Sequence, residues 1–351
     1  MSEAPVQTAD DSPFSAPSET VLNSTQRIAI TGATGFIGRH LCEALRQQGI
    51  SVVPLSRRQT GIEGEVVADL AEPNSLAQLL KGANIVVHCA GYAHAHEEYS
   101  QGDEKHQLVN RDYALNTARA AASAGVRRFV FCSSVKAVGE PADQRADESF
   151  TAPPETSYGR AKHAAEHGLA EIGAATGMEI VILRFAMVYG PGSRGNFERM
   201  LESVARRRFP PLPETENKRS MVHVSDAVSA LILAARHPAA AGRTYIAAHP
   251  HAVSGRELYL AMRSACSLPR SRWAVPAWIL RSAGKGGDLI GKLLGRRMPL
   301  DGQAVDRLLN SAWYSPAALQ KEIGWMPRID LDEGLISLSA PDRSSGPWSK
   351  R

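Results

Sequence analysis

The chain has few cysteines, and none of them are paired at metal-ligand spacing. Its 351 residues include Cys42, Cys89, Cys132 and Cys266, with no CxxC arrangement. A histidine-rich stretch, GYAHAHEEYS at 91–100, also matches no standard ligand set. Paired cysteines are what disulfide frameworks and zinc sites require. We therefore expect no disulfide and no metal site, and a reducing compartment such as the cytoplasm.

Long apolar runs and concentrated charge are missing as well. No apolar run approaches the roughly 18 residues that cross a bilayer, so we expect no transmembrane segment. The net charge is +4 and the bases are scattered, which disfavours a nucleic-acid partner. The first 26 residues carry four acids and no base, unlike a signal peptide. We expect residues 1–26 and 339–351 to be disordered.

Strand-like apolar runs alternate with helical periods as far as residue 185. The runs lie at 27–31, 51–55, 65–70, 84–91, 127–134 and 178–185. Helical patterns fill the gaps, the longest at 158–176. This alternation predicts an α/β fold, a Rossmann-type doubly wound parallel sheet with helices on both faces.

The pattern becomes loop-rich beyond Gly190. We expect helices near 197–208, 226–237 and 255–266, and a smaller substrate-binding domain over 187–338 that follows a dinucleotide-binding domain over 27–186. The part around 220–250 is expected to return to the first domain. Residues 273–297 mix Trp, Ile and Leu with glycines and bases, which favours an amphipathic helix pair that covers the core, with Trp273 inside it. A membrane-surface helix is the alternative, and the glycines weigh against it.

A glycine fingerprint follows the first strand. It reads GATGFIG, from Gly32 through Thr34, Gly35, Phe36 and Ile37 to Gly38. Its place between a strand and a helix indicates a pyrophosphate-binding turn, because glycines let backbone amides and the helix N-terminus approach the anion. A second match, GPGSRG at 190–195, lacks a returning strand, and we assign it to the substrate side.

A tyrosine and a lysine stand at helical spacing in the sequence Tyr158-Gly-Arg-Ala-Lys162. A strand that ends in Ser133 and Ser134 precedes them, and both should meet the cofactor edge of the sheet. Carbonyl reduction needs a proton donor for the developing alkoxide. We expect Tyr158 to be that donor, Lys162 to lower the pKa of Tyr158, and Ser134 to orient the substrate oxygen.

These motifs together resemble one family. TGATGFIG, VVHCAG, FVFCSSVKAVGE, SYGRAK, LRFAMVYGPG and RSMVHVSDA occur in the order found in extended short-chain dehydrogenase/reductases of the nucleotide-sugar epimerase/dehydratase group, and the resemblance covers roughly residues 27–335. It implies a catalytic triad of Ser134, Tyr158 and Lys162. It also implies a homodimer built from the helices near 110–125 and 158–175.

The resemblance further implies ligand contacts. Asp69 and Leu70 would flank the adenine, Ala90, Gly91 and Ser133 would line the cofactor, Asn110 would fix the active-site architecture, and Lys162 would hold the nicotinamide ribose. For the substrate, Arg219 would pair with a nucleotide-sugar diphosphate, as bidentate guanidinium groups do well. Asn196 would contact the same ligand.

Departures from the family pattern narrow the reaction. Val135 and Lys136 stand where sugar dehydratases carry an Asp-Glu pair, and Met187 stands where typical 4-epimerases carry Asn. Lys136 and Met187 are expected to face the substrate. The pattern is closest to reductases of UDP-linked 4-keto sugars in surface polysaccharide (lipopolysaccharide) biosynthesis. A UDP-sugar 4-epimerase with tightly bound NAD, a reductase of a non-sugar ketone and a catalytically silent dinucleotide sensor remain as alternatives.

The end of the second strand bears on the cofactor. An acid usually follows the glycine turn by about 20 residues and binds the ribose hydroxyl of NAD. Here the strand ends in Ser56, Arg57 and Arg58. A serine removes the repulsion of a 2′-phosphate and arginines offer it a fork of donors. We therefore expect NADP(H), with NAD(H) as the alternative. A simpler interpretation is that Arg57 and Arg58 are surface arginines in a solvated turn and bind no phosphate.

Overall fold

The computed structural model describes residues 26–92, 102–193, 195–294, 298 and 301–339. The expected disordered leader and tail, apart from Gln26 and Ser339, and the histidines at 94 and 96 lie outside these residues. In the described part of the chain, no helix is both long enough and apolar enough to cross a membrane.

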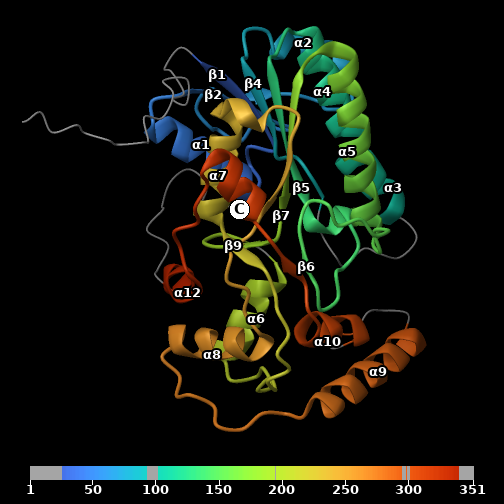
Figure 1. Ribbon diagram of the computed structural model, residues 1–351, viewed down its shortest axis with the longest axis vertical. Coiled ribbons are helices and arrows are strands. Elements are labelled where there is room, and N and C mark those ends of the chain that lie inside the picture. The colour runs from blue at the N-terminus through green and yellow to red at the C-terminus, as the bar shows by residue number, and fades with distance from the viewer. Residues whose placement is uncertain (1–25, 93–101, 194, 295–297, 299–300, 340–351) are drawn as a thin grey trace, which may run out of the picture.

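Seven parallel strands form one sheet in the order β10-β7-β5-β4-β1-β2-β3 (Figure 1). The strands are β1 (Arg27–Thr31), β2 (Ser51–Ser56), β3 (Val66–Val67), β4 (Ile85–His88), β5 (Arg128–Ser134), β7 (Glu179–Phe185) and β10 (Thr244–Ala247). The order runs outward from β1 in one direction and from β4 in the other. Ligands of open α/β sheets bind at the carboxyl ends of the strands beside such a reversal. The predicted fold class is confirmed.

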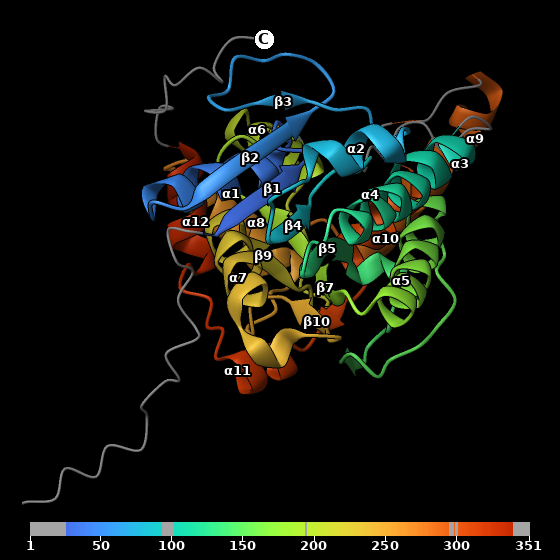
Figure 2. The same cartoon turned by 90° about the horizontal axis from the view of Figure 1, so that it is seen from above.

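Helices cover both faces of the sheet (Figure 2). One face packs against α1 (Phe36–Gln47), α7 (Val224–Arg236) and α11 (Ala317–Ile323). The other packs against α2 (Pro73–Leu79), α4 (Tyr113–Ser123) and α5 (Ser157–Thr176). Alanines dominate the buried sides of α4 and α7, which lets the helices approach the strands closely.

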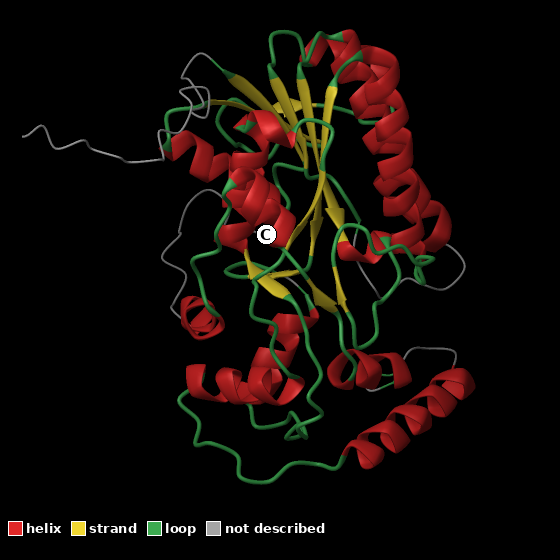
Figure 3. Ribbon diagram, in the orientation of Figure 1, coloured by secondary structure: helices red, strands yellow, loops and turns green. Residues whose placement is uncertain are grey.

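A second apolar core lies below the carboxyl end of the sheet (Figures 1 and 3). It is built by α6 (Asn196–Ala205), α8 (Gly255–Ala265), α9 (Ala277–Leu294), α10 (Gly302–Leu309) and α12 (Leu331–Ser339). The remaining elements are short: α3 (Gly102–His106), η3 (Gln107–Asp112), η4 (Val135–Ala137), η5 (Pro238–Ala240), β6 (Arg145–Ala146), β8 (Met187–Tyr189), β9 (Met221–His223) and β11 (Trp313–Tyr314). The chain returns to the sheet through α7 and β10.

Three expectations about local structure were wrong: the strand at 65–70, the helix pair at 273–297 and the burial of Trp273. The strand expected at 65–70 is only the two-residue β3, because Asp69 and Leu70 already turn toward α2. Residues 107–112 form a π-helix ahead of α4. Residues 273–297 hold one described helix, α9, in place of a helix pair over the core. Trp273 is 65% exposed, because the loop before α9 lies on the surface.

Candidate active site

Close contacts with the backbone require glycine at two positions of the turn after β1. Gly32 has a φ of +66°, and a Cβ on it would lie 2.6 Å from the backbone nitrogen of Ala90. A Cβ on Gly38 would collide with the carbonyl oxygen of Gly32. Gly35 caps α1, whose first turn reads FIGR without an acid, so its amides and positive end suit an anion. These residues fit the pyrophosphate of a dinucleotide.

The loop after β4 is fixed by Asn110. This residue is fully buried in the π-helix. Its Oδ1 accepts a hydrogen bond from the backbone N–H of Tyr92, and its Nδ2 donates to the Tyr92 carbonyl, both at 2.9 Å. A Cβ on Gly91 would meet Asn110 Oδ1 at 3.2 Å and Lys162 Nζ at 3.7 Å. π-Helices of one turn often mark functional sites, and here one holds the backbone around Gly91 beside the candidate lysine.

The two residues expected beside an adenine differ in exposure. Asp69 is exposed, and its Oδ1 accepts a hydrogen bond of 2.9 Å from the N–H of Ala71. The side chain of Leu70 is buried in the core. Of this pair, Asp69 is therefore the one whose side chain reaches solvent.

The start of α5 brings the candidate triad together. Thr156 caps the helix, and its hydroxyl accepts a hydrogen bond from the N–H of Gly159 at 3.0 Å. Gly159 lies against the carbonyl of Lys136, so that a Cβ there would collide with it. This close approach places the Tyr158 hydroxyl in a hydrogen bond with the side chain of Ser134.

The protonation state of the triad differs from the expectation. Burial raises the pKa of Tyr158 to about 12, and the hydrogen bond with Ser134 only partly offsets this. Lys162 was expected to lower this pKa. Instead its ammonium donates 2.7 Å to the carbonyl of Cys132 and lies 4.4 Å above the ring of Phe131. Burial lowers the pKa of Lys162 to about 8. The Tyr158 phenol is therefore neutral at pH 7.

Ser133 is engaged inside the protein. Its hydroxyl donates 2.5 Å to Oε1 of Glu166, whose other oxygen pairs with Arg184 at 2.7 Å. All three side chains are largely buried, and the carboxylate is satisfied by charged and neutral donors together. Any contact of Ser133 with a cofactor is thus left to its backbone.

An acidic side chain does lie at the end of β2, but it belongs to Glu65, which follows the next loop. The carboxylate of Glu65 accepts hydrogen bonds from the Ser56 hydroxyl at 2.5 Å and from the Thr60 N–H at 2.7 Å. Several such bonds together lower the pKa of Glu65 to about 2. Ser56 is buried, whereas Arg57 and Arg58 are exposed. Sequence spacing missed Glu65 because the acid follows the strand by nine residues through a folded loop.

A cavity of about 780 Å³ opens between the triad and the second core. Lys136 and Thr156 line it on the triad side, and Arg281 and Arg307 on the other side. Four acids also belong to its wall: Glu140, Asp143, Glu155 and Asp306. Lys136 pairs with Glu140. Burial, followed by the charge of Arg219, lowers the pKa of Lys136 to about 8. Arg281 and Arg307 were not foreseen, because they lie in the irregular region and match no motif.

The other expected substrate residues are spread along this side. Arg219 is held by backbone bridges to Val253 and Ala312, and its Nη1 donates 3.0 Å to the carbonyl of Asn310, which lines the cavity. Met187 is 38% exposed on β8. Asn196 is the exposed first residue of α6. Of these expected residues, Arg219 is the one whose charge acts on the pKa of Lys136.

The loop at 190–195 contacts the start of α1. The carbonyl of Pro191 accepts hydrogen bonds from Nη2 of Arg39 at 2.9 Å and from Nε2 of His40 at 3.0 Å. This loop therefore touches the helix that follows the glycine turn, through Arg39 and His40.

Comparison with known proteins agrees with this geometry. Residues 28–248 match the model of the NAD dependent epimerase/dehydratase family. The chain is 31% identical over 321 residues to a UDP-glucose 4-epimerase of Vibrio cholerae, covering 88% of this chain and 93% of the relative. It is 27% identical to a 2-alkyl-3-oxoalkanoate reductase of Stenotrophomonas maltophilia, covering 90% of this chain and 98% of the relative.

A solved structure, MoeE5 in complex with UDP-glucose and NAD, superposes with a TM-score of 0.68 at 27% identity. The match covers 89% of this chain and 97% of that one. The recognition of an enzyme from the extended short-chain dehydrogenase/reductases is thereby confirmed. The chain belongs to the NAD dependent epimerase/dehydratase family.

Proposed function

We propose that the protein is an NAD(P)H-dependent reductase of a UDP-linked 4-keto sugar. The observation that carries the proposal is the Tyr158 hydroxyl, hydrogen-bonded to Ser134 at the start of α5, close to the cavity that Lys136 and Thr156 line. A phenol kept protonated by burial is suited to give a proton to a developing alkoxide. The relatives named above include both epimerases and reductases, which supports the chemistry at the coarser level.

The chain's own residues then have distinct roles. The Ser134 hydroxyl orients the substrate carbonyl oxygen next to the phenol. Tyr158 transfers its proton to that oxygen, and Lys162 stabilises the negative charge left on the ring. Gly32, Gly35 and the start of α1 hold the cofactor diphosphate. A bound reduced nicotinamide supplies the hydride for carbon 4 of the sugar.

The substrate diphosphate is assigned to the basic side of the cavity. Lys136, Arg219 and Arg307 influence one another's charge there. Burial, and after it the charges of Arg219 and Arg307, lower the pKa of Lys136, and a bound dianion would offset the repulsion among these bases. Arginine forks suit phosphate oxygens. Met187 and Asn196 are proposed to contact the same ligand.

The proposed cofactor is NADPH, held by Arg57 and Arg58, with NADH as the alternative that Glu65 favours. Both arginines are exposed at the end of β2, where a 2′-phosphate would lie. The Glu65 carboxylate next to Ser56 opposes such a phosphate. The double change Arg57→Ala with Arg58→Ala should raise KM for NADPH far more than for NADH. Equal effects on both would refute the assignment. Glu65→Gln should lower KM for NADPH selectively.

A UDP-sugar 4-epimerase is the second candidate, supported by the Vibrio cholerae relative. There the same residues would oxidise and re-reduce carbon 4 while the cofactor stays bound. Incubation with NADPH and a UDP-4-keto sugar separates the two. Consumption of one NADPH per sugar supports the reductase. Interconversion of the two 4-hydroxy epimers of a UDP-sugar, supplied in a parallel incubation without NADPH, supports the epimerase.

The Stenotrophomonas relative favours a third possibility, reduction of a non-sugar ketone. Calorimetric binding of UDP, lost in Arg219→Ala, would argue against it.

Three further statements remain proposals: a division at residue 186 into a cofactor and a substrate domain, a homodimer through α4 and α5, and a cytoplasmic location. Light scattering of the purified chain tests the dimer.

A further inference from the structure

Exposed apolar side chains are concentrated in one segment. Among the described residues, twelve large apolar side chains are exposed, and seven of them lie between residues 273 and 294. Trp273 is 65% exposed, Trp278 68% and Leu293 78%. The others are Ile279, Leu289, Ile290 and Leu294. Soluble surfaces seldom gather such residues without a partner, so this segment is a candidate docking surface.

These residues occupy one side of α9. At 100° per residue, Trp278, Leu289, Leu293, Ile279 and Ile290 fall within about a third of the helix circumference. We call these five residues the α9 apolar face. The side that packs on the protein is different and carries Leu280, Gly284 and Gly287.

The glycines of α9 have a packing role. A Cβ on Gly284 would lie 2.9 Å from Val305 and 3.2 Å from the carbonyl of Asp301. The carboxylate of Asp288 accepts a hydrogen bond of 3.1 Å from the N–H of Gly302. These contacts hold α9 on α10 and compensate for the low helix propensity of glycine. The sequence argument against a surface helix therefore does not apply, because α9 is supported from behind.

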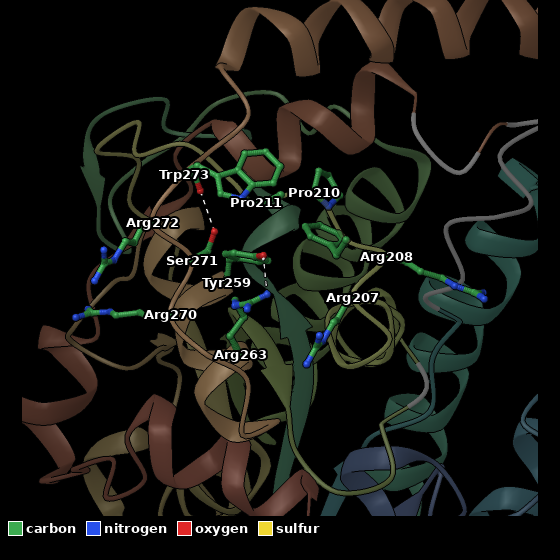
Figure 4. Close-up of a pocket in the computed structure, with 11 residues that line it drawn as sticks. Arg207, Arg208, Pro210, Pro211, Tyr259, Arg263, Arg270, Ser271, Arg272 and Trp273 are labelled. Atoms are coloured by element: carbon green, nitrogen blue, oxygen red, sulfur yellow. Dashed lines mark hydrogen bonds between the residues drawn. The ribbon is translucent and has the colours of Figure 1, made fainter.

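Basic residues accompany the apolar face. Residues 263–294 hold six bases and one acid, whereas the whole chain has a net charge of only +4. Arg281, Lys285 and Lys292 follow one flank of the face at helical spacing. A cavity of about 500 Å³ before α9 is lined by Arg207, Arg208, Arg263, Arg270, Arg272 and Trp273 (Figure 4). The charge of the surface suits an anionic partner.

The loop that carries Trp273 is held in place. Arg256 donates hydrogen bonds to the carbonyls of Ser271 at 2.6 Å and Trp273 at 3.2 Å. Arg263 donates 2.8 Å to the carbonyl of Pro269, and the N–H of Val275 donates 2.9 Å to that of Pro211. The loop and α9 follow one another along the lower edge of the molecule in Figure 1. The exposure of Trp273 is thus built into the fold.

We propose that Trp273, the α9 apolar face and the neighbouring bases dock the protein on the surface of an anionic lipid bilayer. A helix with aromatic and leucine side chains on one side and bases beside them lies well in the headgroup region. Anionic lipids attract the bases. A second copy suits the surface poorly, because a two-fold interface would bring the same basic patch against itself.

Docking would bring the bilayer near the substrate cavity. Arg281, on the flank of the apolar face, also lines the cavity that contains Lys136. A protein held by α9 would therefore receive its substrate next to the membrane surface. The docking itself does not depend on the proposed reaction, and it is tested without turnover.

The test is co-sedimentation of the full chain with vesicles of phosphatidylcholine, with or without phosphatidylglycerol. We expect sedimentation with the phosphatidylglycerol vesicles only, and a blue shift of tryptophan emission. The double change Leu289→Glu with Leu293→Glu should lower the bound fraction at least tenfold. About 1 M salt, which shortens the screening length to roughly 3 Å, should also weaken binding.

The matched control is Ile336→Glu, which places an acid on another exposed apolar residue, on α12. It should leave sedimentation unchanged, and circular dichroism should show that all variants fold. Absence of vesicle binding by the unchanged protein overturns the proposal. So does equal loss in the control variant. If the double change instead dissociates an oligomer in gel filtration, a second copy covers the face and the proposal is also wrong.

Discussion

The cofactor side and the substrate side of the protein are built in different ways. On the cofactor side, backbone contacts leave no room for a side chain at Gly32, and Asn110 fixes the neighbouring loop through paired hydrogen bonds. On the proposed substrate side, Lys136 lines a wide cavity, and burial and the charge of the nearby Arg219 lower its pKa. The first side is a rigid scaffold, and the second is where we propose that the substrate diphosphate binds. Four predictions test this contrast.

The largest effect is expected at the proton donor. Tyr158→Phe removes the phenolic proton while it keeps the ring, so turnover should fall by about 10³-fold, within the range of general acid catalysis. Tyr245→Phe is the control, because that buried hydroxyl contacts Glu322 on the far edge of the sheet. Steady-state rates of both variants measure the difference. Equal rates for Tyr158→Phe and the unchanged protein would remove Tyr158 from the chemistry.

The scaffold is tested by two glycines of similar φ. Gly49 has a φ of +72° and open space around it, so Gly49→Ala should lower the free energy of unfolding by about 1 kcal/mol. Gly32→Ala adds a clash with Ala90 and should cost roughly 3 kcal/mol or more, with loss of cofactor binding. Urea unfolding and cofactor calorimetry measure these effects. Similar losses of unfolding free energy at both sites would show that the positive φ, and not the contact with Ala90, is the reason why the turn requires glycine.

Lys162 is expected to destabilise the fold, although we propose that it acts in the active site. Its pKa in the folded state is about 8, below the ordinary 10.5. Between these pH values the unfolded chain binds more protons, so stability rises with pH there and is lowest below pH 8. Lys162→Met should therefore raise the free energy of unfolding at pH 7 by roughly 2 kcal/mol, after the loss of one hydrogen bond.

The rise between pH 8 and 10.5 should also weaken in Lys162→Met. Urea unfolding at pH 7 and at pH 10 measures both effects, with a change of the exposed Lys321 on α11, Lys321→Met, as the control. A less stable Lys162→Met at pH 7 would contradict the account.

The smallest effect is expected at the anion site. The pKa of Lys136 is about 8, so its charge is lost as the pH rises through that value. KM for the nucleotide sugar should therefore increase above pH 8. Lys136→Met should raise KM about tenfold at pH 7, leave kcat nearly unchanged and abolish the pH dependence of KM, because one charge-assisted contact is lost. Lys81→Met is a distant control. A fall in kcat without a change in KM would place Lys136 in the chemistry instead.

The same contrast explains what the sequence could predict. Gly32, Tyr158 and Lys162 belong to motifs whose spacing follows from strand and helix periods, so their elements were foreseen. Glu65 reaches Ser56 only through the folded loop between β2 and β3, and no linear spacing encodes that contact. The pKa of Tyr158 was expected to fall, but burial, which a sequence does not show, raises it.

The substrate side was foreseen least. Arg307 and Arg281 come from helices in the irregular region and meet Lys136 only in the folded chain. Trp273 was assigned to the core because large aromatics usually lie there, yet its loop is held on the surface by Arg256. Packing between helices that are distant in sequence decided these positions.

Transfer of deuterium from an added cofactor tests the proposed reaction most directly. The protein is incubated with NADPH deuterated at the transferred position and a UDP-4-keto sugar, and the product is examined by mass spectrometry and NMR. The account predicts one deuterium at carbon 4 of each product molecule, with an equal amount of oxidised cofactor released. Recovery of the 4-keto sugar unreduced, with no deuterium at carbon 4 and no oxidised cofactor released, would contradict it.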